Sequence, residues 1–333
     1  MVGKQLMLCA SLILGLFLGG CASVDQGDYL EAYEETYRAK VNYRTHSVPR
    51  DGYRIHVREY GKRGELPALV LMHGFPDSMH LYDRLVPLLL GHRQVITFDF
   101  LGWGDSDKPE GHRYDVESLR RDLEAVITYF DLRRIVPVVH DASGQPGIDW
   151  SVENPEKTAG LVLLNTYYGP SPALRAPEAI ERFSTPGIKR DISVWMTRHF
   201  DALWIQGYNR QIAEFISREE LREPYQKLLG HQSLQIRPAF YGLNRVLNEE
   251  VEKRGNRMGE LQGVKAPVRI IFGKEDADLN AGVAVHLHEL FPNSELYLIE
   301  NAGHFVQVDE PGTVAELIRC FPRDEKSCMA EGG

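Results

Sequence analysis

Short apolar runs that end in polar residues recur along this chain, and amphipathic stretches lie between them. The apolar runs span residues 68–72, 95–98, 135–139, 161–164, 268–272 and 296–299. Runs of this length are typical of strands buried on both faces, and strands that alternate with helices form a parallel sheet covered on both sides. Residues 53–60 alternate in polarity and are expected to form an edge strand. The pattern therefore predicts an α/β fold with a mostly parallel, doubly wound sheet.

This alternation stops between residues 169 and 263. Prolines punctuate the start of the segment, and residues 195–248 have the patterning of several helices. Because the strand pattern resumes at Val268, we expect an inserted helical cap, with a second independent domain as the alternative. The expected organisation is a core of residues 45–168 and 264–322, a cap of residues 169–263 and a tail of residues 323–333.

The first twenty residues have the features of an export signal. Lys4 precedes an apolar run from Leu6 to Leu18, which is shorter than the ~20 residues that cross a bilayer as a helix. Leu18-Gly19-Gly20-Cys21 resembles a bacterial lipobox, which implies cleavage before Cys21 and attachment of lipid to it. An ordinary cleaved signal and an uncleaved anchor are the alternatives. We expect a signal peptide over 1–20 and a tether over 21–44, whose residues 22 to about 42 could instead form a short helix. The lipid would hold the protein in the bacterial cell envelope, at the outer membrane in a Gram-negative host.

Charge and cysteine content limit the partners. The formal net charge is −9 and no basic block occurs, which argues against a nucleic-acid partner. Cys320 and Cys328 could form a disulfide in an oxidising compartment or remain free thiols. The histidines show no metal-ligand spacing, so neither a metal nor another cofactor is expected.

Residues 140–144, at the end of the third apolar run, have the spacing of a nucleophile elbow. Such an elbow needs small residues two before and two and three after the reactive residue, because strand and helix backbones approach closely there. With Asp141 as the nucleophile, Val139 comes before it and Ser143 and Gly144 follow it. With Ser143 as the nucleophile, Asp141 and Gln145 would occupy the tight positions. The spacing therefore favours Asp141.

This elbow and three further motifs resemble the aspartate-nucleophile branch of the α/β-hydrolase family, which contains epoxide hydrolases and haloalkane dehalogenases. Residues 73–76, His-Gly-Phe-Pro, look like an epoxide-hydrolase oxyanion loop, and residues 99–109 look like a loop that both groups share. Residues 140–156 look like the dehalogenase elbow and the helix after it. The order Asp141, Asp276, His304 is the family's order of nucleophile, acid and histidine. The resemblance implies an α/β-hydrolase fold with a helical cap.

The resemblance also implies a mechanism. The Asp141 carboxylate attacks a saturated carbon and forms an alkyl ester. His304 then activates water, while Asp276 orients the imidazole; Asp278 is the alternative acid.

Backbone N–H groups would stabilise the charge that develops on the ester carbonyl during hydrolysis. The resemblance assigns this oxyanion hole to the amides of Phe75 and Ala142.

Fewer residues of the sequence indicate which leaving group the enzyme handles. Dehalogenases of the family hold the halide with a Trp directly after the nucleophile, but this chain has Ala142 there, and epoxide hydrolases usually carry that Trp as well. The family's cap tyrosines, which protonate an opened epoxide, suggest Tyr241 and Tyr208. The resemblance therefore favours a membrane-tethered enzyme that opens a small apolar epoxide. A haloalkane dehalogenase with the same mechanism and a degenerate binding lipoprotein are the alternatives.

Overall fold

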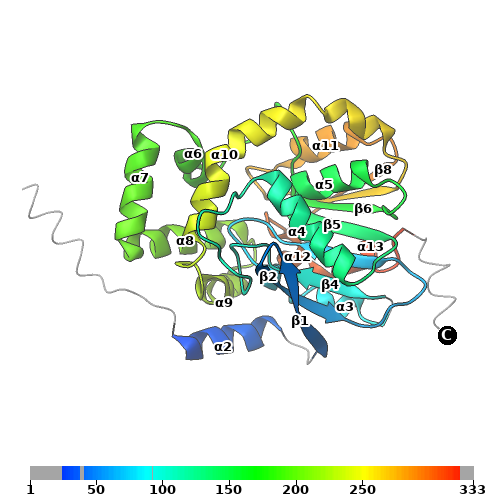
Figure 1. Cartoon of the computed structure of the whole chain (residues 1–333), viewed down its shortest axis with the longest axis horizontal. Coiled ribbons are helices and arrows are strands. Elements are labelled where there is room, and N and C mark those ends of the chain that lie inside the picture. Colours follow the sequence, from blue (N-terminus) through cyan, green and yellow to red (C-terminus); the bar gives the residue numbers. More distant parts are fainter. Residues whose placement is uncertain (1–24, 38–40, 92, 323–333) are drawn as a thin grey trace, which may run out of the picture.

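The computed structural model describes residues 25–37, 41–91 and 93–322. They form an eight-stranded sheet flanked by helices, with a group of further helices beside it (Figure 1). Cys21, the expected signal peptide and the tail of residues 323–333 lie outside the described residues. Cys320 is disulfide-bonded, and its expected partner Cys328 also lies outside them. None of the helices in the described part is long and apolar enough to cross a membrane.

The sheet is mostly parallel, as predicted, with strand order β1-β2-β4-β3-β5-β6-β7-β8. β1 pairs antiparallel with β2, and β2 pairs antiparallel with β4; all other neighbours are parallel. The strands are β1 (Tyr43–Arg50), β2 (Tyr53–Tyr60), β3 (Ala68–Met72), β4 (Val95–Phe98), β5 (Ile135–Asp141), β6 (Leu161–Thr166), β7 (Val268–Gly273) and β8 (Ser294–Ile299).

The expectation that residues 53–60 form the edge strand is wrong, because β1 covers that side of β2. Asp51 and Gly52 connect the two strands with φ angles of 50° and 86°. Two positive φ angles make a turn whose twist matches the right-handed twist of the flanking strands. The turn therefore folds β1 back as the outermost strand.

The helices of the core lie between successive strands, except for the last two of them, which follow β8. They are η1 (Met79–Tyr82), α3 (Val86–Leu89), α4 (Val116–Tyr129), α5 (Gly144–Glu153), α11 (Ala281–Leu290), α12 (Val306–Asp309) and α13 (Pro311–Ile318). Asp115 is the N-cap of α4, and its carboxylate accepts a hydrogen bond from the Ser118 N–H at 2.9 Å. This bond satisfies one of the free N–H donors in the first turn of the helix. Leu119, Leu123 and Val126 lie on one face of α4 and are buried.

The cap lies between β6 and β7. It comprises α6 (Glu178–Ser184), α7 (Ile188–His199), α8 (Asp201–Phe215), α9 (Glu219–Gly230) and α10 (Arg237–Gly255), and η2 (Met258–Gly263) leads back to the sheet. Within residues 167–267, all of which are described, no strand occurs. An insertion of helices between two parallel neighbours of one sheet is the arrangement that the sequence predicted.

The segment expected to be a tether or a short helix contains a helix, α2 (Gln26–Thr36). α2 contacts α9 of the cap, and Figure 1 shows the two helices side by side. The rings of Tyr29 and His231 stack with their centres 3.9 Å apart. The described part of this segment is therefore docked on the cap.

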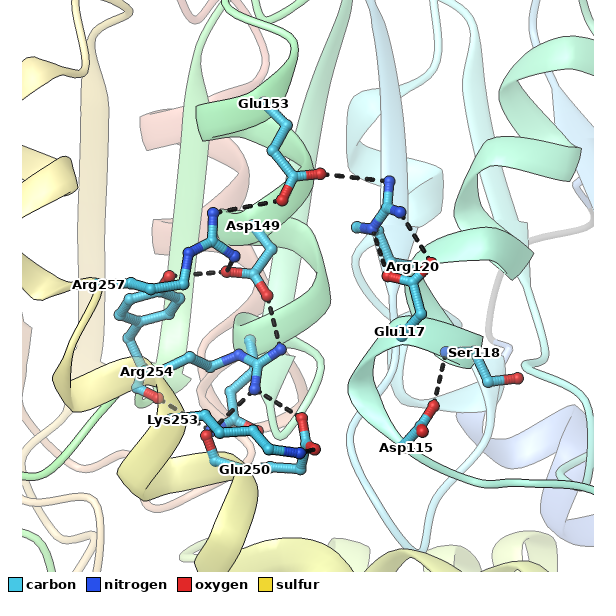
Figure 2. Close-up of polar contacts among 12 residues, drawn as sticks. Asp115, Glu117, Ser118, Arg120, Asp149, Glu153, Glu250, Lys253, Arg254 and Arg257 are labelled. Atoms are coloured by element: carbon cyan, nitrogen blue, oxygen red, sulfur yellow. Dashed lines mark hydrogen bonds and ion pairs between the residues drawn. The ribbon is translucent and has the colours of Figure 1, made fainter.

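A buried ion-pair network joins the end of the cap to the core (Figure 2). Arg254, in the last turn of α10, lies 2.6 Å from the Asp149 carboxylate of α5 and 2.6 Å from Glu250. Arg257 lies 2.9 Å from Asp149 and 3.2 Å from Glu153. Because α5 starts three residues after Asp141, these contacts fix the returning cap chain against the helix of the elbow.

Candidate active site

Asp141 ends β5 and is followed closely by α5, as an elbow requires. Its backbone φ is +50°, a conformation that L-residues other than Gly rarely adopt. Gly144 is the small residue that the turn needs, because a Cβ on it would lie 1.9 Å from Oγ1 of Thr166. The geometry that the spacing predicted for Asp141 is therefore present.

Two backbone N–H groups reach the Asp141 carboxylate. The Phe75 N–H donates to Oδ2 at 3.0 Å, and the Ala142 N–H also donates to this carboxylate. His73 holds the loop before Phe75: its Nδ1 lies 2.6 Å from the Gly74 oxygen, and its Nε2 accepts the Phe100 N–H at 3.1 Å. The structure thus brings both expected oxyanion donors to the expected nucleophile.

His304 pairs with Asp276 at the ends of β8 and β7. Nδ1 of His304 lies 2.7 Å from Oδ2 of Asp276. That carboxylate also accepts a hydrogen bond from Asn165 at 2.9 Å, and its Oδ1 accepts the N–H groups of Asp278 and Leu279 at 3.0 Å each. The contact uses Nδ1, so Nε2 is the ring nitrogen left for chemistry.

Electrostatics favour the charged forms of this pair. Burial raises the pKa of Asp276, but the charge of His304 and the hydrogen bonds from His304 and Asn165 outweigh it and lower the pKa to about 2. Burial lowers the pKa of His304, but the charges of Asp276, Asp141 and Asp77 and the hydrogen bond to Asp276 raise it to about 9. Burial raises the pKa of Asp141 above its ordinary value, against the lowering effect of His304 and the two N–H groups.

Asp278, the alternative acid, occupies a different position. Its backbone supports Asp276, and burial together with the charge of Asp276 raises the pKa of its own carboxyl. Within the described part of the chain, its carboxylate makes no hydrogen bond to His304. The imidazole is therefore oriented by Asp276.

A cavity of about 160 Å³ contains Asp141 and His304. Most of its other walls are apolar, and the cap contributes Ile180, Phe215, Phe240, Leu243, Leu247 and Val251 to them. Polar side chains also line it: Tyr167, Arg175, Gln211, Asn244, Asn248 and Asp278. A cavity with these walls fits a small, largely apolar molecule that carries a polar group.

The two cap tyrosines expected as proton donors do not line this cavity. The Tyr208 hydroxyl donates to the backbone oxygens of Pro76 at 3.2 Å and Leu229 at 3.3 Å. The Tyr241 hydroxyl donates to Thr197 of α7 at 2.8 Å. Successive helical residues point about 100° apart, and α10 turns Phe240 rather than Tyr241 toward the cavity. The expected placement of these two phenols is therefore corrected.

Three polar side chains that were not predicted from the sequence lie in or near the cavity. Tyr167, directly after β6, lines the cavity; burial and the charge of Asp141 raise the pKa of its phenol well above the ordinary value. Gln211 of α8 also lines the cavity, and its buried Nε2 makes no hydrogen bond among the described residues. The position of Tyr167 just past a strand's carboxyl end was the available signal.

Asp77 is the third of these groups and lies close to the site but outside the cavity. Burial and the charge of Asp141 raise the pKa of its carboxyl to about 8, so it is mostly neutral near pH 7. No group of His, Cys, Asp or Glu in the described ranges could hold a metal ion.

Comparison with known proteins gives the family. Residues 67–311 match the model of the "alpha/beta hydrolase fold". The chain belongs to this family. A Cis-3-alkyl-4-alkyloxetan-2-one decarboxylase of Shewanella oneidensis is 26% identical over 311 residues, which cover 87% of this chain and 91% of that protein.

Two further relatives carry other chemistry. Bifunctional epoxide hydrolase 2 of Sus scrofa is 23% identical over 299 residues, covering 80% of this chain and 53% of that protein. The crystal structure of haloalkane dehalogenase DatA from Agrobacterium tumefaciens superimposes with a TM-score of 0.69 at 22% identity, covering 84% of this chain and 95% of DatA. The α/β-hydrolase fold is thus shared among proteins of several activities.

Proposed function

We propose that this α/β hydrolase opens a small apolar epoxide through an ester on Asp141. The observation that carries the proposal is the half-buried Asp141 carboxylate at the elbow, bound by the Phe75 N–H and sharing one largely apolar cavity with His304. A carboxylate held in this way is suited to attack a saturated carbon, whereas its attack on an ordinary ester would give a mixed anhydride.

In the first half-reaction, one Asp141 oxygen bonds to an epoxide carbon and that carbon's bond to the ring oxygen breaks. The ring oxygen stays on the substrate and takes the proton of the Tyr167 phenol. The raised pKa of this phenol keeps it protonated until the alkoxide develops. The products are an alkyl ester on Asp141 and a phenolate on Tyr167.

The second half-reaction follows from the loss of charge on Asp141. Because the Asp141 carboxylate helps to raise the pKa of His304, forming the ester lowers that pKa. His304 then releases its Nε2 proton to solvent and becomes a base. His304 takes a proton from water, and the hydroxide adds to the ester carbonyl. The developing oxyanion accepts the N–H groups of Phe75 and Ala142, each worth about 3 kcal/mol in comparable sites.

Collapse of this intermediate breaks the bond to the substrate oxygen, which receives the His304 proton and leaves as a diol. The Asp141 carboxyl then returns a proton to the Tyr167 phenolate through solvent, and His304 takes back from solvent the proton that it released. One epoxide and one water are consumed and one diol is formed, with every side chain restored.

Halide release is the second candidate, because the Gln211 Nε2, which has no hydrogen-bond partner in the described part of the chain, is suited to hold a departing halide. Incubating the protein with panels of epoxides, haloalkanes and dialkyl oxetan-2-ones, with diol, halide and lactone loss measured in parallel, separates these activities. We expect diol formation, which Tyr167→Phe lowers about 10²-fold as the loss of a proton donor does. The matched control is Tyr241→Phe, whose hydroxyl lies outside the cavity and whose loss should leave the rate unchanged.

Strong halide release that Tyr167→Phe leaves intact would contradict the epoxide proposal. Turnover of no panel member would favour the degenerate binding lipoprotein.

The proposal includes membrane attachment through lipid on Cys21 in the bacterial cell envelope. It is supported by the resemblance of Leu18-Gly19-Gly20-Cys21 to a lipobox.

A further inference from the structure

α7 carries exposed apolar side chains on one face. Ile188, Ile192 and Trp195 are 76%, 51% and 54% exposed. Their spacing of four and three residues places them on the same side of the helix, and no residue of α7 is buried. Figure 1 shows α7 at the outer end of the cap, away from the sheet. A contiguous exposed apolar face of this kind marks an interaction surface.

The flanks of this apolar face are cationic. Lys189 lies on one side of it and Arg198 on the other, and both are exposed. α7 holds Lys189, Arg190 and Arg198 against the single acid Asp191, although the whole chain has a net charge of −9. A helix with an apolar face and a basic polar face is typical of one that lies in the plane of a membrane interface.

A hollow of about 250 Å³ adjoins this face between α7 and α10. Arg190, Arg198 and Arg245 line it together with Trp195, Tyr241 and the acid Asp191, which pairs with Arg190 at 3.2 Å. The Arg198 guanidinium lies 5.1 Å from the centre of the Tyr241 ring. Among the residues that the structure describes, neither Arg198 nor Arg245 has an ion-pair or hydrogen-bond partner. Guanidinium groups whose N–H donors have no partner in the described structure are suited to bind a phosphate.

We propose that α7 docks on an anionic phospholipid bilayer, with its apolar face at the acyl-chain boundary and a lipid phosphate between Arg198 and Arg245. A free phosphate would leave the apolar face unexplained. A bilayer satisfies both features, because its phosphates lie directly beside its acyl chains. Trp195 borders both the face and the hollow, as expected for a tryptophan at a membrane interface.

This docking would bring the catalytic cavity close to lipid. α6 contacts α7; its Ile180 lines the catalytic cavity, whereas its Phe183 lines the hollow. The inference is independent of the reaction proposed above and of the lipid on Cys21, so its failure would leave both standing.

The fluorescence of Trp195 can report contact with lipid, because the other tryptophans are buried: Trp103, Trp150 and Trp204 are 0%, 2% and 5% exposed. The full chain is reconstituted in vesicles of phosphatidylcholine with and without phosphatidylglycerol, in which some acyl chains are brominated. We expect bromine quenching of fluorescence in the anionic vesicles, strongest for bromines near the headgroups. Trp195→Phe should remove the quenched component.

The double variant Arg198→Gln/Arg245→Gln should reduce this quenching about twofold or more, to the level in neutral vesicles. Arg133→Gln/Arg134→Gln is the charge-matched control, because these exposed arginines lie in the turn before β5; it should retain the quenching. Absence of quenching in anionic vesicles, or equal quenching in neutral vesicles that the arginine substitutions leave unchanged, would overturn the proposal.

Two other occupants have distinct signatures. A concentration-dependent blue shift of Trp195 emission without lipid would assign the face to a second copy of the chain and overturn the proposal. Quenching abolished by inorganic phosphate, but not by chloride at equal ionic strength, would assign the hollow to a free anion and also overturn it.

Discussion

Replacing Asp276 with Asn removes the charge that pairs with His304 but keeps the shape of the side chain. In the folded protein the pKa of Asp276 falls from 3.8 to about 2, which corresponds to about 2 kcal/mol of stabilisation when the carboxyl is ionised. The pKa of His304 rises from 6.5 to about 9, which gives a similar magnitude. Both shifts describe one ion pair, so they are not added, and the expected loss in Asp276→Asn is about 2 kcal/mol.

The pH dependence of this loss is bell-shaped. A carboxyl with a lowered pKa stabilises the fold above its unfolded pKa and loses that effect as pH falls through about 2. A histidine with a raised pKa stabilises the fold below its unfolded pKa and loses that effect as pH rises through about 9. The difference in unfolding free energy between the wild type and the variant should therefore be largest between about pH 4 and 6.5.

Urea unfolding followed by tryptophan fluorescence, repeated from acid to alkaline pH, measures this difference. Asp278→Asn is the matched control. Because burial and the Asp276 charge raise the pKa of Asp278, its replacement should leave stability at neutral pH unchanged or increased. A loss in Asp276→Asn that is constant with pH, or a bell-shaped loss in Asp278→Asn instead, would refute the assignment of Asp276 as the partner of His304.

Three further perturbations test other parts of the structure. Asp141→Asn removes a negative charge that raises the pKa of His304. An NMR titration, with the His304 resonance assigned by His304→Gln, should therefore show a His304 pKa below about 9. An unchanged pKa would contradict the proposed fall in the His304 pKa when the ester forms. Arg254→Gln breaks the buried ion pair with Asp149 and should lower the free energy of unfolding in urea by about 3 kcal/mol. The exposed control Arg133→Gln should lower it little. Equal losses would argue that the ion pairs between α10 and α5 do not fix the cap to the core. Cys21→Ser should abolish acylation and normal signal processing, and an unmodified wild-type N-terminus at another residue, found by mass spectrometry, would exclude the lipidation proposal.

Some of this architecture could be predicted from the sequence because the signals are local. Asp141 follows an apolar strand and has small residues at the required offsets, so the elbow was predictable from a few neighbouring positions. Asp276 and His304 each follow a predicted strand, and the carboxyl ends of parallel strands meet at one edge of the sheet. Their proximity therefore follows from topology alone.

Other features depend on side-chain direction or on distant contacts. Tyr241 and Phe240 are adjacent in sequence, yet only Phe240 lines the catalytic cavity, and a rotation of about 100° per residue decides this. The docking of α2 on α9 joins segments far apart in the chain. The strand β1 had a local signal, the Asp51-Gly52 turn, that the alternation of residues 53–60 obscured.

Intact-protein mass spectrometry of His304→Gln can detect the proposed ester on Asp141. This variant keeps the nucleophile but lacks the base that activates water, so the ester should accumulate after mixing with an epoxide that the wild type turns over. We expect a mass increase equal to the whole epoxide, mapped to Asp141 and absent in Asp141→Asn/His304→Gln. Undiminished steady-state turnover without an adduct, or an adduct mapped to Ser143, would contradict it.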